Sequence, residues 1–386
     1  MDNKFIPYGS QWIEKEDIES VKEALKSDFI TTGPKVDEFE EKFADYVGAK
    51  YAVAIANGTA ALHAATFAAG IQKGDEVITT PITFAASANC ILYQGGTPVF
   101  ADINPDTYNI DLQSIEDKIT DNTKAIIPVD FTGQPCDLDK IKEIADKYNL
   151  TIIEDGAHAL GAEYQDKQVG SIADMTTFSF HPVKHITTGE GGMITTDSKE
   201  LYEKLKQFRT HGITKEPSRY KNDIDGPWYH EQQHLGYNYR LTDIQCALGI
   251  SQLKKIDKFL KRRKDIAGKY NKAFKNFEGI NIPYQKKHNS SAWHIYVIRL
   301  ELEKLKTGRR EIFEALRDKN LGVNVHYIPV YYHPYYQDLG YEKGLCPEAE
   351  NLYERIITIP LYPKMSDEDV NLVIQRVKDT INSIKK

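Results

Sequence analysis

The sequence predicts an α/β protein in which a mostly parallel central sheet lies between layers of helices, followed by a smaller α+β domain. Over residues 1–274, short apolar runs alternate with amphipathic stretches, which is the pattern of strands that alternate with helices. The apolar runs are continuous, as expected for strands of a parallel sheet that is covered on both faces. After residue 274 the spacing of the runs changes. We therefore expect a large domain at 1–274, with an N-terminal helical segment, and a small C-terminal domain at 275–386.

Each expected element follows from its own run of residues. Apolar runs predict strands at 51–56, 76–79, 97–101, 125–129, 151–154, 175–180 and 192–196. Helical periodicity predicts helices at 59–69, 85–93, 138–148 and, as one long helix, 242–274. In the C-terminal domain we expect strands at 293–300, 322–325 and 356–359 and helices at 309–319 and 367–384. The polar segment 211–234 predicts a long loop, a type of segment that often carries function.

Composition excludes several classes of protein. The net charge is −7, and a mildly acidic chain without a basic face gives no support for nucleic-acid binding. The N-terminal residues lack an apolar export signal, and no apolar run reaches the roughly 18 residues of a membrane span. The four cysteines are scattered, without disulfide or metal spacing. We expect a cytoplasmic enzyme that is not attached to a membrane.

The first candidate ligand site follows the first apolar run, in the sequence NGTAAL at 57–62. Gly58 and Thr59 stand at the expected start of a helix. Unpaired backbone N–H groups and the helix dipole bind anions at such a position. A plain N-cap by Thr59 is the alternative interpretation.

The second candidate is the pair of acidic residues that ends the run TIIEDG at 151–156. Ligands of open α/β sheets bind outside the carboxyl ends of the strands, and a carboxylate there can pair with a protonated ring nitrogen. We choose Asp155 for this role, because alternation along a strand points Glu154 to the other face. His158, three residues further on, can contact a ring substituent. The alternative interpretation of the two acids is that they only end the strand. For His158, the alternative is a structural role.

The third candidate is the segment TFSFHPVKHITTGEGG at 177–192. Ser179 can bind a phosphate, and Lys184 can bind an aldehyde covalently once it is unprotonated. No other Lys, Arg, Asp or Glu lies between 175 and 189, and apolar surroundings lower the pKa of a lysine. A phosphate site, a carboxylate for a ring nitrogen, the aromatic Phe84 and this lysine are the parts that pyridoxal 5′-phosphate (PLP) requires.

With these motifs the chain resembles the DegT/DnrJ/EryC1/StrS sugar aminotransferases, within the fold type I PLP-dependent transferases. The resemblance covers essentially the whole length. The matching segments are 30–34, 57–62, 81–89, 97–102, 153–162, 179–192, 209–212, 236–241 and 325–329. The sequence FHPVKHITTGEGG is most similar to the subgroup that aminates C4 of a UDP-4-keto-6-deoxy-N-acetylhexosamine in the pseudaminic acid pathway.

The resemblance implies PLP as cofactor, with pyridoxamine phosphate as the form that carries the amino group. Lys184 would be the catalytic residue, bound to the cofactor and moving protons. The other implied cofactor contacts are Gly58, Thr59, Phe84, Asp155, His158, Ser179 and Asn238. Asn238 would reach the phosphate of the partner subunit, which implies a homodimer with shared sites. The implied nucleotide-sugar pocket comprises Tyr8, Phe29, Ile30, Thr31, Gly58, Ser179, Asn238, Arg240, His326 and Tyr327.

The reaction implied is an amino transfer (EC 2.6.1.-, best matched by 2.6.1.92) from L-glutamate to C4 of the keto sugar, for a surface glycan of the pseudaminic acid type. Another keto sugar nucleotide, aminated at C3 or C4 and linked to dTDP or GDP, remains open. A catalytically silent protein that binds nucleotide sugars is a further alternative, but the presence of Lys184, Asp155 and Ser179 together argues against it.

A zinc hydrolase is the rival from another class. The residues His230, Glu231 and His234 fit the H-E-x-x-H motif. The motif requires a helix that places both histidines on one face, with the glutamate as base. Glycine and proline flank the segment, so we expect no metal there, and none at the similarly spaced His181 and His185.

Overall fold

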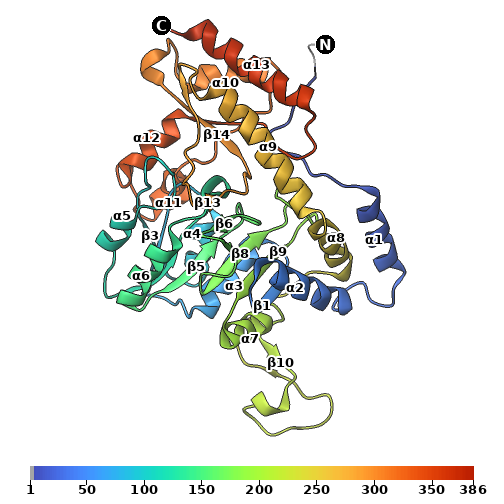
Figure 1. Ribbon diagram of the computed structural model, residues 1–386. Helices are drawn as coiled ribbons and strands as arrows, with labels where there is room; N and C mark the ends of the chain where they lie inside the picture. The colour runs from blue at the N-terminus through green and yellow to red at the C-terminus, as the bar shows by residue number, and fades with distance from the viewer. Residues whose placement is uncertain (1–3) are drawn as a thin grey trace.

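The computed structural model describes residues 4–386 and has a seven-stranded sheet at its centre (Figure 1). The strand order is β1-β9-β8-β5-β4-β2-β3. Only β9 runs against its neighbours, β1 and β8, while the other pairs are parallel. The strands are β1 Tyr51–Ile55, β2 Glu76–Thr79, β3 Thr97–Phe100, β4 Thr123–Ile127, β5 Thr151–Asp155, β8 Met175–Ser179 and β9 Gly192–Thr196. The expected α/β class is confirmed.

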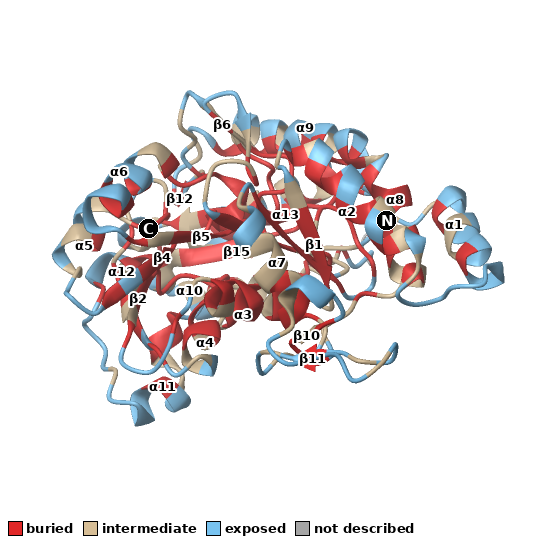
Figure 2. Ribbon diagram, turned by 90° about the horizontal axis from the view of Figure 1, so that it is seen from below, coloured by how far each residue is buried: buried red, intermediate tan, exposed pale blue. Residues whose placement is uncertain are grey.

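Helices cover both faces of this sheet, and the buried strands lie between them (Figure 2). Along β1, Val53 and Ile55 pack with α3 and α7, whereas Ala52 and Ala54 pack with α2 and α8. Burial on both faces explains why the strands are apolar throughout. The helices of these layers are α2 Pro34–Val47, α3 Gly58–Ala68, α4 Ala86–Tyr93, α5 Leu112–Asp117, α6 Leu138–Tyr148, α7 Lys199–Phe208 and α8 Asp243–Leu253.

A second core lies around the C-terminal sheet β12-β14-β15, beside α10 and α13 (Figure 1). Its elements are β12 Ile280–Asn281, β14 Tyr296–Leu300, β15 Ile356–Ile359, α10 Arg309–Asp318 and α13 Asp367–Ile384, while α12 Pro347–Arg355 packs in a neighbouring cluster. The second half of α9 (Ile256–Phe274) and the N-terminal Ile6 also belong to this core. We propose that the boundary between the domains follows the end of α9, at 274/275.

The remaining elements are short, apart from α1. They are α1 Lys15–Lys26, α11 Pro334–Asp338, β6 Glu163–Tyr164, β7 Lys167–Gln168, β10 Ile213–Thr214, β11 Glu231–Gln232 and β13 Asn289–Ser290. The segment 211–234 is the expected excursion, and it projects from the body of the protein below α7 (Figure 1). It contains the β10–β11 pair, so it is not entirely a loop.

Two expected elements differ in the structure. The single helix at 242–274 is broken at Lys254 and Lys255 into α8 and α9. The break coincides with an ion pair, because Lys255 Nζ lies 2.5 Å from the buried carboxylate of Asp17. The expected strand at 322–325 is absent: Asn324 forms only an isolated bridge to Thr358.

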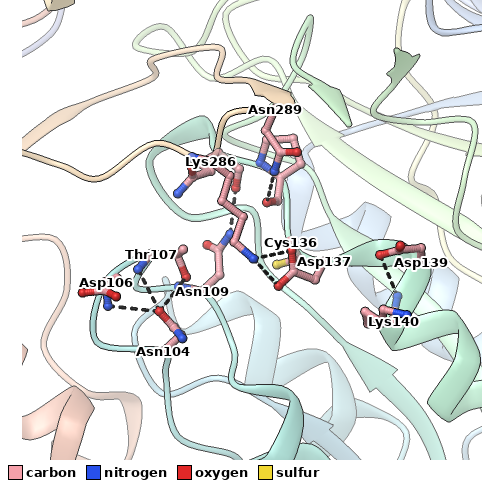
Figure 3. Close-up of polar contacts among 12 residues, drawn as sticks. Asn104, Asp106, Thr107, Asn109, Cys136, Asp137, Asp139, Lys140, Lys286 and Asn289 are labelled. Atoms are coloured by element: carbon pink, nitrogen blue, oxygen red, sulfur yellow. Dashed lines mark hydrogen bonds and ion pairs between the residues drawn. The ribbon is translucent and has the colours of Figure 1, made fainter. Parts of the chain in front are cut away.

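Polar contacts connect residues 286–294, after α9, to residues 132–137 of the loop that follows β4 (Figure 3). Lys286 Nζ lies 2.6 Å from Asp137 Oδ1, and the side chain of Asn289 donates to the Pro135 carbonyl. A few residues further on, the amide of His294 donates to the Thr132 carbonyl at 2.9 Å. The loop after β4 therefore positions His294 beside the carboxyl ends of the central strands.

A buried ion pair links α2 to β1. Glu40 accepts hydrogen bonds from the Ala54 amide, at 2.8 Å, and from the Arg209 guanidinium. Arg209 also donates to the Ala54 carbonyl at 2.7 Å. Both side chains are buried, so removing one leaves the other without a counter-charge.

We predict that Glu40→Ala lowers the free energy of unfolding by about 3–5 kcal/mol, because it leaves the buried Arg209 charge unpaired. Glu38→Ala is the matched control on the same helix, since Glu38 pairs with Lys35 and Lys42 at the surface. It is expected to change the stability by less than about 0.5 kcal/mol. Urea unfolding followed by circular dichroism measures both values, and equal losses would contradict this account.

Candidate active site

A cavity of about 840 Å³ opens at the carboxyl ends of β5 and β8, at the N-terminus of α3. This is the edge at which α/β sheets bind ligands. The structure brings together ten of the residues singled out from the sequence, which are Tyr8, Gly58, Thr59, Phe84, Asp155, His158, Ser179, Lys184, His326 and Tyr327.

One end of the cavity has the character of a phosphate site. Asn57 is the N-cap of α3, because its side chain accepts a hydrogen bond from the Ala60 amide at 2.8 Å; the interpretation of Thr59 as the cap is wrong. The amides of Gly58 and Thr59 lie in the first turn, where no intrahelical partner exists. A Cβ on Gly58 would lie 2.9 Å from that of Ser179, so only glycine brings the two positions this close.

Asp155 is the last residue of β5 and lies on the floor of the cavity. Its Oδ2 accepts a hydrogen bond from the Ser87 hydroxyl at 2.7 Å, and its Oδ1 accepts one from the Ala157 amide. Burial raises the pKa of this carboxyl, and the two hydrogen bonds oppose the rise. Glu154 points to the opposite face, where Thr176 donates to it, as strand alternation requires.

His158 lies next to Asp155 in the same cavity. Its Nε2 is 3.1 Å from the Tyr327 hydroxyl, and its ring centroid lies 4.3 Å from that of His294, with the two rings tilted by 41°. Burial, followed by the nearby charge of Lys184, holds its pKa well below the usual range, so the ring is neutral. Within residues 4–386, Nδ1 is buried without a hydrogen-bond partner. A polar group of a bound molecule would satisfy it.

Lys184 follows a turn after β8 and its side chain opens into the cavity. Burial lowers the pKa of its ammonium to about 8; Asp155 opposes this effect and Arg263 adds to it. A free lysine has a pKa of about 10.4. Near neutral pH, Lys184 therefore has a much larger unprotonated fraction than a free lysine, and this is the form that attacks an aldehyde.

The wall opposite Phe84 is aromatic. The ring centroids of Tyr8 and His326 lie 5.5 Å apart, and those of Phe84 and Tyr327 lie 6.3 Å apart. His326 is held by the Thr358 hydroxyl at 2.8 Å from its Nδ1. The aromatic side chains therefore form an apolar side of the cavity.

Five predicted pocket residues do not line the cavity of the single chain. They are Phe29, Ile30, Thr31, Asn238 and Arg240. The first four are exposed. Asn238 forms a bridge with Thr210 at the base of the 211–234 excursion, and its neighbour Tyr239 does line the cavity.

Sequence reasoning missed several lining or supporting residues, namely Asn57, Ser87, Tyr239, His294 and Asn324. Ser87 had a weak signal, because it stands in the first turn of the helix expected at 85–93, directly after Phe84. His294 had no local signal, since its place depends on contacts with the distant loop after β4.

The zinc interpretation is wrong. Glu231 lies in strand β11 rather than in a helix. Its carboxylate accepts hydrogen bonds from the amides of Lys221 and Asn222. His230 contacts the Trp228 carbonyl and His185 the Ala292 carbonyl. No group of His, Cys, Asp and Glu in residues 4–386 has the arrangement of a metal site.

The cavity fits PLP. The paired Gly58 and Ser179 at a helix N-terminus suit the phosphate, Asp155 suits the pyridine nitrogen, and the unsatisfied His158 nitrogen suits a ring substituent. Lys184 has the lowered pKa that covalent attachment of the cofactor aldehyde requires. The fold and the site thus define a fold type I PLP-dependent enzyme.

The chain belongs to the DegT/DnrJ/EryC1/StrS aminotransferase family, whose sequence model matches residues 11–378. Among its curated relatives, the spore coat polysaccharide biosynthesis protein SpsC of Bacillus subtilis is 46% identical over 98% of both chains. The UDP-4-amino-4,6-dideoxy-N-acetyl-beta-L-altrosamine transaminase of Campylobacter jejuni is 42% identical, over 98% of this chain and 97% of that one.

Solved structures agree with this assignment. PseC of Helicobacter pylori, an aminotransferase involved in the biosynthesis of pseudoaminic acid, superposes with a TM-score of 0.91 at 35% identity, over 98% of this chain and 100% of that one. The PLP form of Spr1654 from Streptococcus pneumoniae has a TM-score of 0.91 at 33% identity, over 98% and 99% of the two chains. The protein is a PLP-dependent sugar aminotransferase of nucleotide-sugar biosynthesis.

Among residues 4–386, no helix combines the length and apolarity needed to cross a bilayer.

We predict that Lys184 of the cofactor-free protein reacts half-maximally with a trace of acetic anhydride near pH 8, because burial lowers its pKa to about 8. Mass spectrometry of the Lys184 peptide across a pH series measures the midpoint. The same lysine in urea-unfolded protein serves as the control, with an expected midpoint near 10.4. A folded-state midpoint as high as the unfolded one would contradict the described environment of Lys184.

Proposed function

We propose that this aminotransferase moves an amino group from L-glutamate to C4 of a UDP-4-keto-6-deoxy-N-acetylhexosamine, the reaction class of EC 2.6.1.92. The product would be a 4-amino sugar nucleotide for a surface glycan of the pseudaminic acid type. The observation that carries the proposal is a single cavity that holds Lys184, Asp155 and the Gly58–Ser179 cradle beside an aromatic wall. The relatives named for altrosamine and pseudoaminic acid support the choice of sugar.

The PLP cofactor, when bound, acts as an electron sink that stabilises a carbanion next to the transferred nitrogen. In our proposal the phosphate is bound by the amides of Gly58 and Thr59 and by the Ser179 hydroxyl. Phe84 would pack against the ring, and Asp155 would keep the ring nitrogen protonated. His158, which lies beside Tyr327, would contact a ring substituent.

Lys184 moves the protons of the reaction. In the first half, its unprotonated Nζ would take the proton from the α-carbon of glutamate. The amino group would stay on the cofactor, and a water molecule would supply the keto oxygen of the departing 2-oxoglutarate. In the second half, Lys184 would deliver a proton to C4 of the sugar, where the amino group replaces the keto oxygen, which leaves as water. The donor departs before the sugar enters, so the kinetics are ping-pong. The aromatic wall of Tyr8, His326 and Tyr327 binds the sugar nucleotide and excludes water.

A second candidate substrate is another keto sugar nucleotide, aminated at C3 or C4 or linked to dTDP or GDP. The 46% identity to SpsC supports this second candidate, because SpsC is named for the biosynthesis of a different glycan, the spore coat polysaccharide.

We predict that the purified enzyme converts the UDP-4-keto sugar and L-glutamate into the 4-amino sugar nucleotide and 2-oxoglutarate. Liquid chromatography with mass spectrometry detects both products, and dTDP- and GDP-linked keto sugars form the comparison panel. Lys184→Ala is expected to reduce turnover by at least about a thousandfold, because it removes the group that transfers the protons. Lys261→Ala, on the exposed side of α9, is the control and should retain full activity.

Normal turnover by the Lys184→Ala variant would overturn the role of that lysine. Turnover of only dTDP- or GDP-linked sugars would replace the proposed substrate with the second candidate.

We further propose a homodimer with shared active sites. Asn238 is exposed and outside the cavity of its own chain, and we place its side chain at the cofactor phosphate of the partner subunit. Phe29, Ile30, Thr31 and Arg240 are likewise proposed to complete the nucleotide-sugar pocket.

Analytical ultracentrifugation is expected to give twice the mass of 43.9 kDa, since the exposed positions need a partner to complete the site. Asn238→Ala should weaken PLP binding without changing the mass, because it removes one phosphate contact. Asn222→Ala, in the same excursion, is the control. A monomer with full cofactor affinity would contradict the shared site.

A further inference from the structure

Arg263, in the middle of α9, is buried without an acidic partner. Its relative exposure is 1%, and no carboxylate within residues 4–386 pairs with it. All of its hydrogen bonds go to backbone carbonyl oxygens. They are those of His294 at 2.9 Å, Trp293 at 3.2 Å, Leu361 at 3.3 Å and Val183 at 3.5 Å.

Burying a positive charge without a counter-charge costs free energy. An apolar side chain of similar length would fill the same space without that cost. The adjacent Arg262 shows the usual solution, because it pairs with Asp367 at 2.9 Å near the surface. Arg263 is buried without a counter-charge, so we expect it to have a role that requires both the positive charge and the several N–H donors of a guanidinium.

The four carbonyls belong to segments that build the cavity. Val183 directly precedes Lys184, and both line the cavity, as does His294. The amide of Leu361 donates to the Tyr8 carbonyl at 3.1 Å, and Tyr8 belongs to the aromatic wall. One guanidinium thus joins three separate parts of the chain around the lysine.

Asp155 faces Lys184 from β5, while His158, His185, His294 and His326 surround it from the other elements. Glu190 and His181 also line the cavity. Burial lowers the pKa of each of the four surrounding histidines, so the four rings are neutral at pH 7. The phenols of Tyr8 and Tyr327 are neutral as well, because burial raises their pKa values.

We propose that Arg263 is a positioning residue for Lys184: its guanidinium fixes the backbone on both sides of the cavity floor and places an unpaired positive charge near the ε-amino group. The proposal rests on the proposed function only in taking Lys184 as the lysine that binds the cofactor.

The electrostatics agree with this geometry. Burial lowers the pKa of Arg263 to about 9, which leaves it protonated at pH 7. Burial is also the first cause of the lowered pKa of Lys184, and the charge of Arg263 lowers it further. The guanidinium therefore counteracts the effect of Asp155, which favours the protonated ammonium.

The test measures the pH midpoint of Lys184 acetylation in the cofactor-free, full-length protein. Arg263→Met keeps an unbranched, flexible side chain but removes its charge, so the midpoint should move up by about one pH unit. Arg262→Met, one residue earlier on the same helix, is the matched control and should leave the midpoint at the wild-type value. Circular dichroism checks that each variant is folded.

A folded Arg263→Met variant with the wild-type midpoint would overturn the proposal, because a role in packing alone leaves the lysine unchanged. If the methionine variant does not fold, Arg263→Gln, which keeps an N–H donor, takes its place with the same two outcomes. A shifted midpoint in a protein that attaches no PLP to Lys184 would support the positioning by Arg263 and contradict the proposed function alone.

Discussion

The burial of the Lys184 amine is the constraint around which the site is arranged. In water the ammonium is strongly favoured, and only a desolvated setting makes the neutral amine abundant near neutral pH. The protein provides this setting with aromatic and imidazole side chains that burial keeps neutral. Two charges of opposite sign, Asp155 and Arg263, then act on the lysine from different elements.

The fold explains how these groups come to one place. Parallel strands end at a common edge, so the last residues of β5 and β8 deliver Asp155 and Ser179 side by side with the N-terminus of α3. The antiparallel β9 returns the chain behind the lysine turn, where Gly192 pairs with Ser179 and Ile55. The segment after α10 supplies part of the aromatic wall through Tyr327 and its neighbour His326, which is held by Thr358 of β15.

Much of this arrangement was visible in the sequence, because local patterns determine it. Continuous apolar runs predicted the strands, and alternation within 151–155 separated Asp155 from Glu154. What the sequence did not reveal depends on long-range contacts. Arg263 and His294 reach the site only because α9 and the segment after it pack beneath the cavity. The break between α8 and α9 coincides with the ion pair of Lys255 to Asp17, more than two hundred residues away.

The exposed residues that the sequence assigned to the pocket show a second limit of prediction from the sequence. Phe29, Ile30, Thr31 and Asn238 do not line the cavity of one chain. In the proposed dimer, a partner subunit would bring them to the site. Their exposure agrees with the proposed dimer, and the mass of the protein in solution is the direct measure of it.

The central claim, that Lys184 holds the cofactor, is tested most directly by borohydride reduction of the purified protein followed by peptide mapping. The account predicts a visible absorption band near ~410–430 nm that borohydride removes, and a stable phosphopyridoxyl group on the Lys184 peptide. A reduced group on a different lysine, or a protein that binds no PLP after reconstitution, would contradict it.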